Sequence, residues 1–84
     1  MKPIRLSGHA SEQLAFRVAS AGEVIDAIQT ARWQQAELGR LECRKDYPYD
    51  AIWNKNHYQT KQVRPIFVEE EDEIVVVTVY TYFC

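Results

Sequence analysis

Cysteine is scarce in this sequence, and long hydrophobic runs are absent. Cys43 and Cys84 are the only two cysteines, too few for a disulfide framework and without the paired spacing of a zinc site. No stretch approaches the roughly 18 uncharged apolar residues that a membrane helix needs. The residues after Met1 also lead into no apolar signal segment. We therefore expect reduced thiols, no metal or other cofactor, no membrane contact and a cytoplasmic location.

The charges are unevenly distributed along the chain. The 84 residues, 46% of them hydrophobic and 26% charged, predict one small domain over residues 1–84. Residues 1–64 hold all ten basic residues against seven acidic ones, a net charge of +3, whereas the other five acids run without interruption from Glu69 to Glu73. The acidic run is typical of a solvated turn, and the rest of the chain can present a basic surface.

Helical periodicity is confined to the first third of the chain. Ala10, Leu14 and Val18 recur at four-residue spacing and predict a helix over 9–18. Ser20 and Glu23 have the spacing of a capping box, which predicts a second helix that begins there and ends near residue 32 or 33.

The remaining two thirds are rich in β-forming residues. We expect a short edge strand over 2–6, and a half-exposed strand or one arm of a hairpin around Gly39 over 38–47. Residues 51–62 read equally well as a strand or a long loop, so the structure of 48–62 stays open. The strongest signals are strands over 63–69 and 73–83, which should form an antiparallel hairpin across the acidic turn.

The register of that hairpin decides which side chains share a face. If its loop has three residues, eight residues share one face: Arg64, Ile66, Val68, Ile74, Val76, Thr78, Tyr80 and Tyr82. Phe67 then lies in the core with three valines: Val75, Val77 and Val79. A loop one residue longer or shorter would reverse the faces of the first strand.

A polar ridge follows the first predicted helix. His9, Gln13 and Arg17 are spaced by four residues and therefore lie along one side of it. An imidazole can move a proton near neutral pH while a neighbouring guanidinium holds a phosphate. Alternatively, His9 caps the helix or packs on a strand, and Arg17 pairs with an acid.

These segments resemble, in their order along the chain, the small bacterial domains related to BrnT and RelE toxins. The resemblance rests on the run from His9 to Arg17, on the capped helix over 20–28, and on the strand over 74–80. It spans most of the chain. In that family an arginine is typical at the position of Gln13.

The resemblance implies an α+β fold in which two N-terminal helices pack on a twisted antiparallel sheet of three to five strands. It also implies a metal-independent ribonuclease that activates the ribose 2′-OH against the adjacent phosphate. In that reaction His9 would act as acid or base, Arg17 and Arg64 would hold the phosphate, and Tyr80 would supply a hydroxyl or stack on a base. The basic middle of the chain would bind RNA through three further residues: Arg44, Lys45 and His57.

Two other functions remain open. The chain could be a catalytically silent member of the fold that binds a protein partner, in keeping with its aromatic residues Trp33, Trp53, Tyr58 and Tyr82. If the chain is a toxin, its partner would be a cognate antitoxin. With either function, the chain could also form a homodimer. A DNA-binding role has less support, because the second helix offers chiefly Gln29, with Arg32 at its end.

Overall fold

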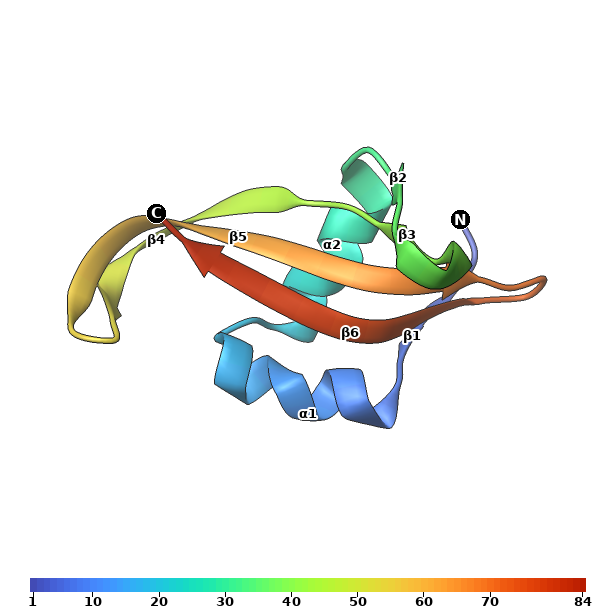
Figure 1. Ribbon diagram of the computed structural model, residues 1–84, viewed down its shortest axis with the longest axis horizontal. Helices are drawn as coiled ribbons and strands as arrows, with labels where there is room; N and C mark the ends of the chain where they lie inside the picture. The colour runs from blue at the N-terminus through green and yellow to red at the C-terminus, as the bar shows by residue number, and fades with distance from the viewer.

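Two short helices lie on one face of a mixed six-stranded sheet in the computed structural model, which describes residues 1–84 (Figure 1). In chain order the elements are β1 (Ile4–Leu6), α1 (Gly8–Arg17), α2 (Ala21–Thr30), β2 (Gln34–Gln35), a 3-10 turn η1 (Glu37–Gly39), β3 (Leu41–Glu42), β4 (Lys45–Trp53), β5 (Asn56–Glu69) and β6 (Ile74–Phe83). The predicted α+β class is confirmed. The sheet has six strands rather than three to five, and β1 pairs with β6 in parallel, so it is not antiparallel throughout. Neither helix is long and apolar enough to cross a membrane.

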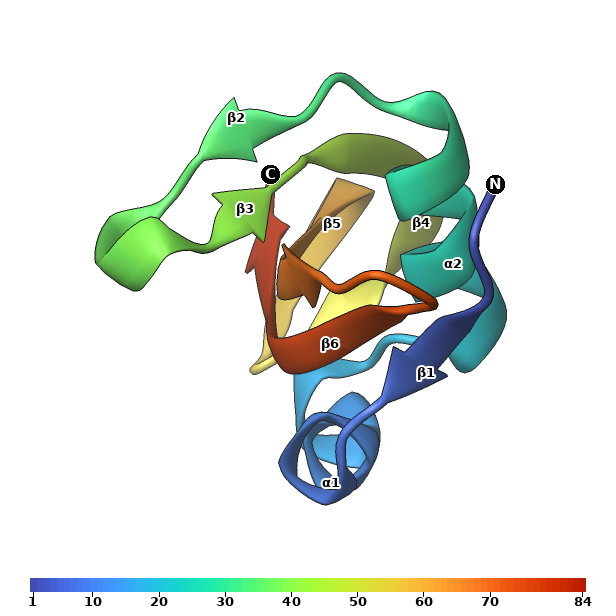
Figure 2. The same ribbon diagram turned by 90° about the vertical axis from the view of Figure 1, so that its right-hand side faces the viewer.

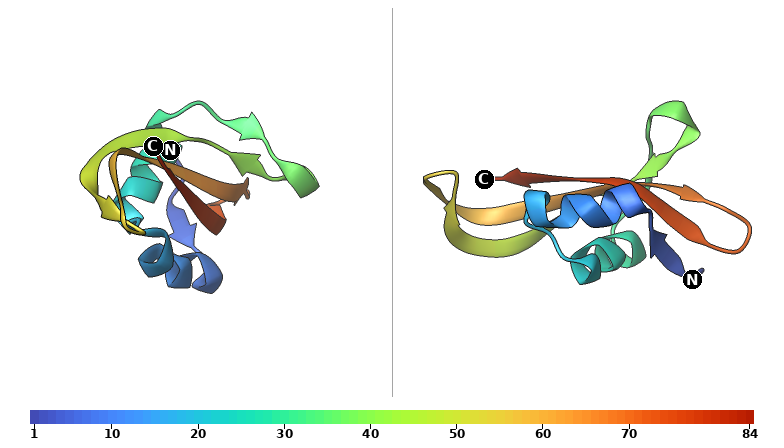
Figure 3. Two further views of the ribbon diagram at one scale, coloured as in Figure 1. Left: turned by 60° about the vertical axis from the view of Figure 1, so that its left-hand side comes forward. Right: turned by 90° about the horizontal axis from the view of Figure 1, so that it is seen from below.

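The 14-residue strand β5 is the spine of the sheet. It pairs with β6 on one side, and on the other side with β4 along its first half and with β3 near its end. The strand order is β1-β6-β5-β3-β2, with β4 joined to β5. Figure 3 shows the β4–β5 hairpin extending past the helices, and the molecule measures 42 Å along its longest axis against 24 and 22 Å.

The β4–β5 hairpin accounts for the region that the sequence left open. Asn54 and Lys55 form its tight turn with φ values of 50° and 70°, and two successive positive φ angles are typical of a type I′ turn. This turn follows the right-handed twist of the two strands that it joins. Residues 51–62 are therefore two paired strands and not a long loop.

The β5–β6 hairpin is confirmed, but a bulge changes part of its register. Ile66 pairs with Thr78, whereas the next residue, Phe67, pairs with Val76. Val77 is therefore an extra residue in β6, and the strand turns its faces over at this point. The prediction that Val75 and Val77 lie in the core is wrong, because both are only half-buried and Ile74 and Val76 are buried in their place. Val79, beyond the bulge, is in the core as predicted.

Both helices begin at a serine cap, and the second cap is the predicted one. Ser7 caps α1 by accepting a hydrogen bond from the backbone N–H of Ala10 at 3.1 Å. Ser20 and Glu23 form the predicted capping box, with bonds of 3.1 and 3.0 Å. Helix α2 ends at Thr30, slightly earlier than expected. Trp33 then turns back, donates to the carbonyl of Ile28 and packs edge-on against the ring of Phe67, so it is half-buried and not an exposed aromatic residue.

The hydrophobic core lies between the helices and the sheet. Ten fully buried apolar residues form it: Ala10, Val24, Ala27, Ile28, Cys43, Val63, Phe67, Ile74, Val76 and Val79. Burial raises the pKa of the Cys43 thiol to about 11, so this thiol stays protonated and acts as a packing residue. Figure 2 shows the two helices against the same side of the strands.

A buried lysine ties the two helices to the sheet. Lys61 of β5 donates to the carbonyl of Val18 at the end of α1 (2.7 Å) and to the Glu23 carboxylate at the start of α2 (2.9 Å). Val18 has the left-handed conformation, φ 55°, that ends the helix. Only 9% of the Lys61 side chain is exposed. The position of α1 on β6 therefore depends on this ammonium group.

Replacing Val76 by Asp should destabilise the protein severely, because it places an unpaired charge in the core. We expect a loss of about 3 kcal/mol or more in the free energy of unfolding, or no folded protein. Val77→Asp is the matched control, since Val77 is only half-buried and lies outside the core, and thermal melting should show a much smaller effect. Equal melting temperatures for the two variants would show that the bulge is misplaced.

Replacing Lys61 by Met should lower the free energy of unfolding by about 2–4 kcal/mol, because the Glu23 carboxylate and the Val18 carbonyl lose a buried donor. Lys55→Met, in the exposed hairpin turn, is the control and should change little. Urea unfolding monitored by circular dichroism measures both. The anchoring role of Lys61 would be refuted if the two variants unfolded at the same urea concentration.

Candidate functional site

A groove of about 510 Å³ lies on the face of the sheet opposite the helices. Its floor consists of β5 and β6, and its wall is the β2–η1–β3 segment, which projects away from the helices (Figures 2 and 3). Ten residues line it: Gln35, Ala36, Glu37, Leu38, Arg40, Glu42, Arg64, Ile66, Thr78 and Tyr80. The predicted sharing of one face by Arg64, Ile66, Thr78 and Tyr80 is confirmed by the strand register.

The wall of the groove is a hairpin with a tightly turned end. β2 and β3 pair antiparallel, as the sequence around Gly39 allowed, and Arg40 closes the turn through backbone bonds to Ala36 and Glu37. Leu38 and Gly39 both have positive φ angles, 60° and 70°. Leucine in this region is strained by about 1–2 kcal/mol, and Leu38 is also 85% exposed. Such strain concentrates at functional segments.

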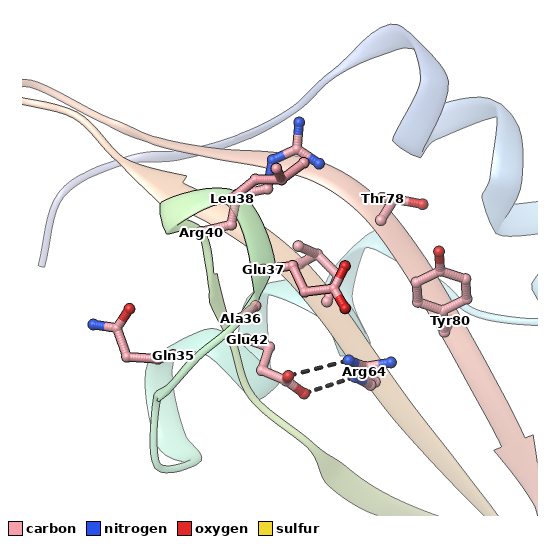
Figure 4. Close-up of a pocket in the computed structure, with 10 residues that line it drawn as sticks. Gln35, Ala36, Glu37, Leu38, Arg40, Glu42, Arg64, Thr78 and Tyr80 are labelled. Atoms are coloured by element: carbon pink, nitrogen blue, oxygen red, sulfur yellow. Dashed lines mark hydrogen bonds and ion pairs between the residues drawn. The ribbon is translucent and has the colours of Figure 1, made fainter.

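Arg64 is held rigidly at the centre of the floor. Its guanidinium donates to both oxygens of Glu42, at 2.6 and 3.1 Å (Figure 4). It also donates to the hydroxyl of Tyr82 at 3.1 Å. The hydrogen bonds from Arg64 lower the pKa of the buried Glu42 carboxyl, and the carboxylate in turn raises the pKa of Arg64. Arg64 is therefore always charged, and Glu42 is a poor proton acceptor.

Tyr80 lies between two guanidinium groups. The central carbon of Arg17 is 5.3 Å from the centre of the Tyr80 ring and that of Arg64 is 5.5 Å away. Arg17 reaches the ring from α1, beyond the outer edge of β6, whereas Arg64 reaches it from β5. The Nε of Arg17 is buried and has no hydrogen-bond partner. Its hydrogen-bonding capacity is therefore not used within the protein.

A third arginine completes the group. The central carbon of the Arg44 guanidinium lies 5.9 Å from the centre of the Tyr82 ring, and its Nε lies 3.5 Å from a carboxylate oxygen of Glu42. Arg17, Arg44, Arg64, Tyr80 and Tyr82 together are named the Arg–Tyr cluster below. Three guanidiniums against the single carboxylate of Glu42 leave a net charge of +2 on this part of the surface.

Gln13 fixes the position of α1 beside the cluster. Its side-chain oxygen accepts hydrogen bonds from the Thr78 hydroxyl (2.6 Å) and from the backbone N–H of Val79 (2.9 Å). Arginine has no acceptor and could not make these two bonds. One turn later, the carbonyl of Arg17 accepts a bond from the hydroxyl of Thr81 at 2.6 Å. The helix is thus locked to β6 where Arg17 covers Tyr80.

The structure brings together four of the seven predicted site residues: Arg17, Arg44, Arg64 and Tyr80. The expectation that the imidazole of His9 would join them is not met. His9 is exposed on the first turn of α1, eight residues before Arg17, or about 12 Å along the helix axis. The ridge that it shares with Gln13 and Arg17 is too long for both of its ends to reach one phosphate.

Lys45 and His57 lie outside the cluster. Lys45 points to the helix side of the sheet, where its ammonium binds Asp26 at 2.7 Å and Thr30 at 2.8 Å. His57 lies near the tip of the β4–β5 hairpin, beside Asp50 at 2.8 Å, about 23 Å along β5 from Arg64. The prediction that both join Arg44 on one RNA-facing surface is therefore wrong, because the alternation and the length of the strands separate them.

The groove contains two carboxylates that the sequence did not single out. Glu42 pairs with Arg64, whereas the Glu37 carboxylate points across the groove towards Tyr80 (Figure 4). In the sequence, Glu42 stands between Leu41 and Cys43, so alternation places it on the opposite face of the strand. Its pairing with Arg64 could not be predicted, because the neighbouring strand was unknown. No group of three or more His, Cys, Asp or Glu side chains is arranged to hold a metal ion.

Comparisons of the chain with protein-family models, with curated proteins and with solved structures found no match.

The Arg64–Glu42 pair should make stability depend on pH. Because the folded protein lowers the pKa of Glu42 below its ordinary value of 4.5, the pair stabilises the fold above pH 4.5 and less as the pH falls through the lowered pKa. Glu42→Gln should therefore be less stable than the parent at pH 7, and the difference should shrink towards pH 3. Urea unfolding at several pH values measures this difference, and a constant difference would contradict the assignment.

Proposed function

We propose that this protein binds RNA at the Arg–Tyr cluster and cleaves it without a metal ion. The observation that carries the proposal is the Arg17–Tyr80–Arg64 arrangement, in which two charged guanidiniums flank a phenol on an open face. Guanidinium groups present paired donors that match phosphate oxygens, and aromatic rings beside them are typical of surfaces that bind single-stranded RNA. The family resemblance of the sequence points to the same activity.

In the proposed reaction the ribose 2′-oxygen attacks the adjacent phosphorus and the bond from phosphorus to the 5′-oxygen breaks. The products are a 2′,3′-cyclic phosphate and a free 5′-hydroxyl. Arg17 and Arg64 stabilise the negative charge that develops on the phosphate oxygens. Tyr80 is 36% exposed, and its hydroxyl would donate a hydrogen bond or a proton to the departing oxygen.

Removal of the 2′-OH proton requires an acceptor. Arg64 cannot accept a proton and Glu42 is a poor base, so the cluster supplies charge more than proton transfer. His9 lies about 12 Å along α1 from Arg17, too far to take this proton from a ribose whose phosphate Arg17 holds, so in this proposal a water molecule accepts the proton. Charge stabilisation by the arginines then supplies most of the rate enhancement.

The proposal includes a partner and a compartment. A toxin of this kind acts in the bacterial cytoplasm, in keeping with the free thiols of Cys43 and Cys84. Its antitoxin would cover the Arg–Tyr cluster with an acidic segment, because the net charge of the cluster is positive. A homodimer is a further expectation from the sequence.

A catalytically silent protein-binding module is the second proposal, and the distal hairpin favours it. Ile52 is 71% exposed there and Trp53 37%. Trp53 stacks on Phe83 with ring centres 4.4 Å apart. An apolar surface of this kind, remote from the Arg–Tyr cluster, suits a protein partner. A folded chain that neither binds nor cleaves RNA would favour this function.

Arg17→Ala should lower both RNA affinity and cleavage about tenfold or more, because it removes one phosphate contact. The slope of log affinity against log salt concentration should also decrease by about 1. Arg32→Ala is the matched control, since Arg32 is exposed and lies outside the cluster. Filter binding and gel analysis of a labelled RNA without added metal measure both quantities.

Two further variants separate the proposed roles. Tyr80→Phe should lower cleavage while RNA affinity is retained, because only a hydroxyl is removed. His9→Ala should leave cleavage unchanged, because the imidazole lies too far along α1 from the phosphate held by Arg17. Induced expression of the intact chain should arrest bacterial growth, and Arg17→Ala should relieve the arrest. Harmless expression of the folded chain together with intact RNA in vitro would refute the ribonuclease proposal.

A further inference from the structure

The Glu37 carboxylate is the unpaired anion of the groove. It takes part in none of the seven ion pairs of the protein, whereas Glu42 is bound by Arg64. Figure 4 shows its two oxygens directed into the groove, between the β2–η1–β3 wall and Tyr80. An acceptor pair in this position is available to a ligand.

The turn fixes the backbone at Glu37, whose exposed side chain extends from it. Backbone bonds from Ala36 to Arg40 (2.8 Å) and from Arg40 to Glu37 (3.1 Å) close the turn, and Leu38 adopts its strained positive φ directly after Glu37. The exposed Leu38 side chain lies at the rim of the groove. Ala36 and Ile66 supply apolar surface inside it. Polar acceptors beside apolar walls are typical of a site for a flat, partly apolar ligand.

The charges divide the site into two parts. Four charged side chains line the groove, the carboxylates of Glu37 and Glu42 and the guanidiniums of Arg40 and Arg64, and Glu42 is paired with Arg64. The unpaired Glu37 carboxylate disfavours a phosphate beside it, whereas Arg17 and Arg44 lie outside the lining. A nucleotide would therefore place its phosphate on the Arg–Tyr cluster and its uncharged base in the groove. The volume of about 510 Å³ is within the range of small-ligand sites.

We propose that the groove is a base-binding subsite selective for guanine, read by Glu37. This inference deepens the proposed function, because it assigns the base next to the cleaved phosphate. Guanine presents two adjacent donors, N1–H and N2–H, which match the two oxygens of one carboxylate. Adenine and cytosine each present one donor beside an acceptor, and uracil presents one donor between two acceptors, so each leaves the carboxylate partly unpaired.

The test is direct titration of the full-length protein with the 3′-monophosphates of guanosine, inosine, adenosine and cytidine by calorimetry. We expect guanosine monophosphate to bind about tenfold or more tightly than the adenosine and cytidine nucleotides. Inosine lacks the N2 amino group and should bind with intermediate affinity. All four carry the same phosphate, so the differences report on the base alone.

Glu37→Gln is the decisive variant, because an amide offers one acceptor and one donor where guanine requires two acceptors. The variant should bind the four nucleotides with similar affinity, and its circular dichroism spectrum should match that of the parent. Glu71→Gln, in the exposed acidic turn, is the matched control and should keep the guanine preference.

Equal affinity for guanosine and adenosine monophosphates, no binding of any nucleotide, or a guanine preference that survives Glu37→Gln would each overturn the inference. These results are distinguishable from failure of the proposed function. Cleavage of RNA without regard to guanine would leave the ribonuclease intact and refute the subsite. Selective guanosine binding with uncleaved RNA would support the subsite and refute the catalysis.

Discussion

The ammonium group of Lys61 is the interaction on which the arrangement of this protein depends. It donates to the C-cap carbonyl of α1 and to the Glu23 carboxylate of the capping box that begins α2. Both helices are thereby connected to the central strand β5 through a side chain that is almost fully buried. Tyr47 and Lys45 extend this polar contact along α2 by binding Glu23 and Asp26. Because the helix ends are fixed from within, α1 has one position on β6, and Arg17 is held over Tyr80.

On the opposite face of the sheet, the fixed elements hold three arginines in a charged surface. Each arginine of the Arg–Tyr cluster comes from a different element, namely α1, the β3–β4 connection and β5. Glu42 holds Arg64 in a fixed orientation, since a bidentate pair restricts both groups. The result is a preorganised positive site next to a groove that presents the unpaired carboxylate of Glu37, which is a suitable arrangement for binding the two ends of one nucleotide.

Local signals in the sequence were sufficient for the helices, the capping box and the last hairpin. They also placed Arg64, Thr78 and Tyr80 on one face, but for a different reason than expected: the turn has four residues instead of three, and the bulge at Val77 offsets the extra residue. The bulge at Val77 could not be predicted, since it depends on how β5 and β6 fit the helices and leaves no mark in the valine run. The wall of the groove was also missed, because short strands such as β2 have no periodicity. His9, Lys45 and His57 were misplaced for a related reason: similar chemistry in the sequence says nothing of distance along a helix or a strand.

The bond from Val79 to Gln13 has a consequence for the border of the sheet. β1 pairs only with the first three residues of β6, Ile74–Val76. The backbone groups that follow along this edge of β6 would otherwise be unpaired and could form hydrogen bonds with a strand of another chain. Gln13 occupies one of these groups with a side-chain oxygen, and α1 lies along the border beyond it. A foreign strand therefore cannot extend the ladder at β6, which protects a valine-rich segment of high β-propensity from cross-β association.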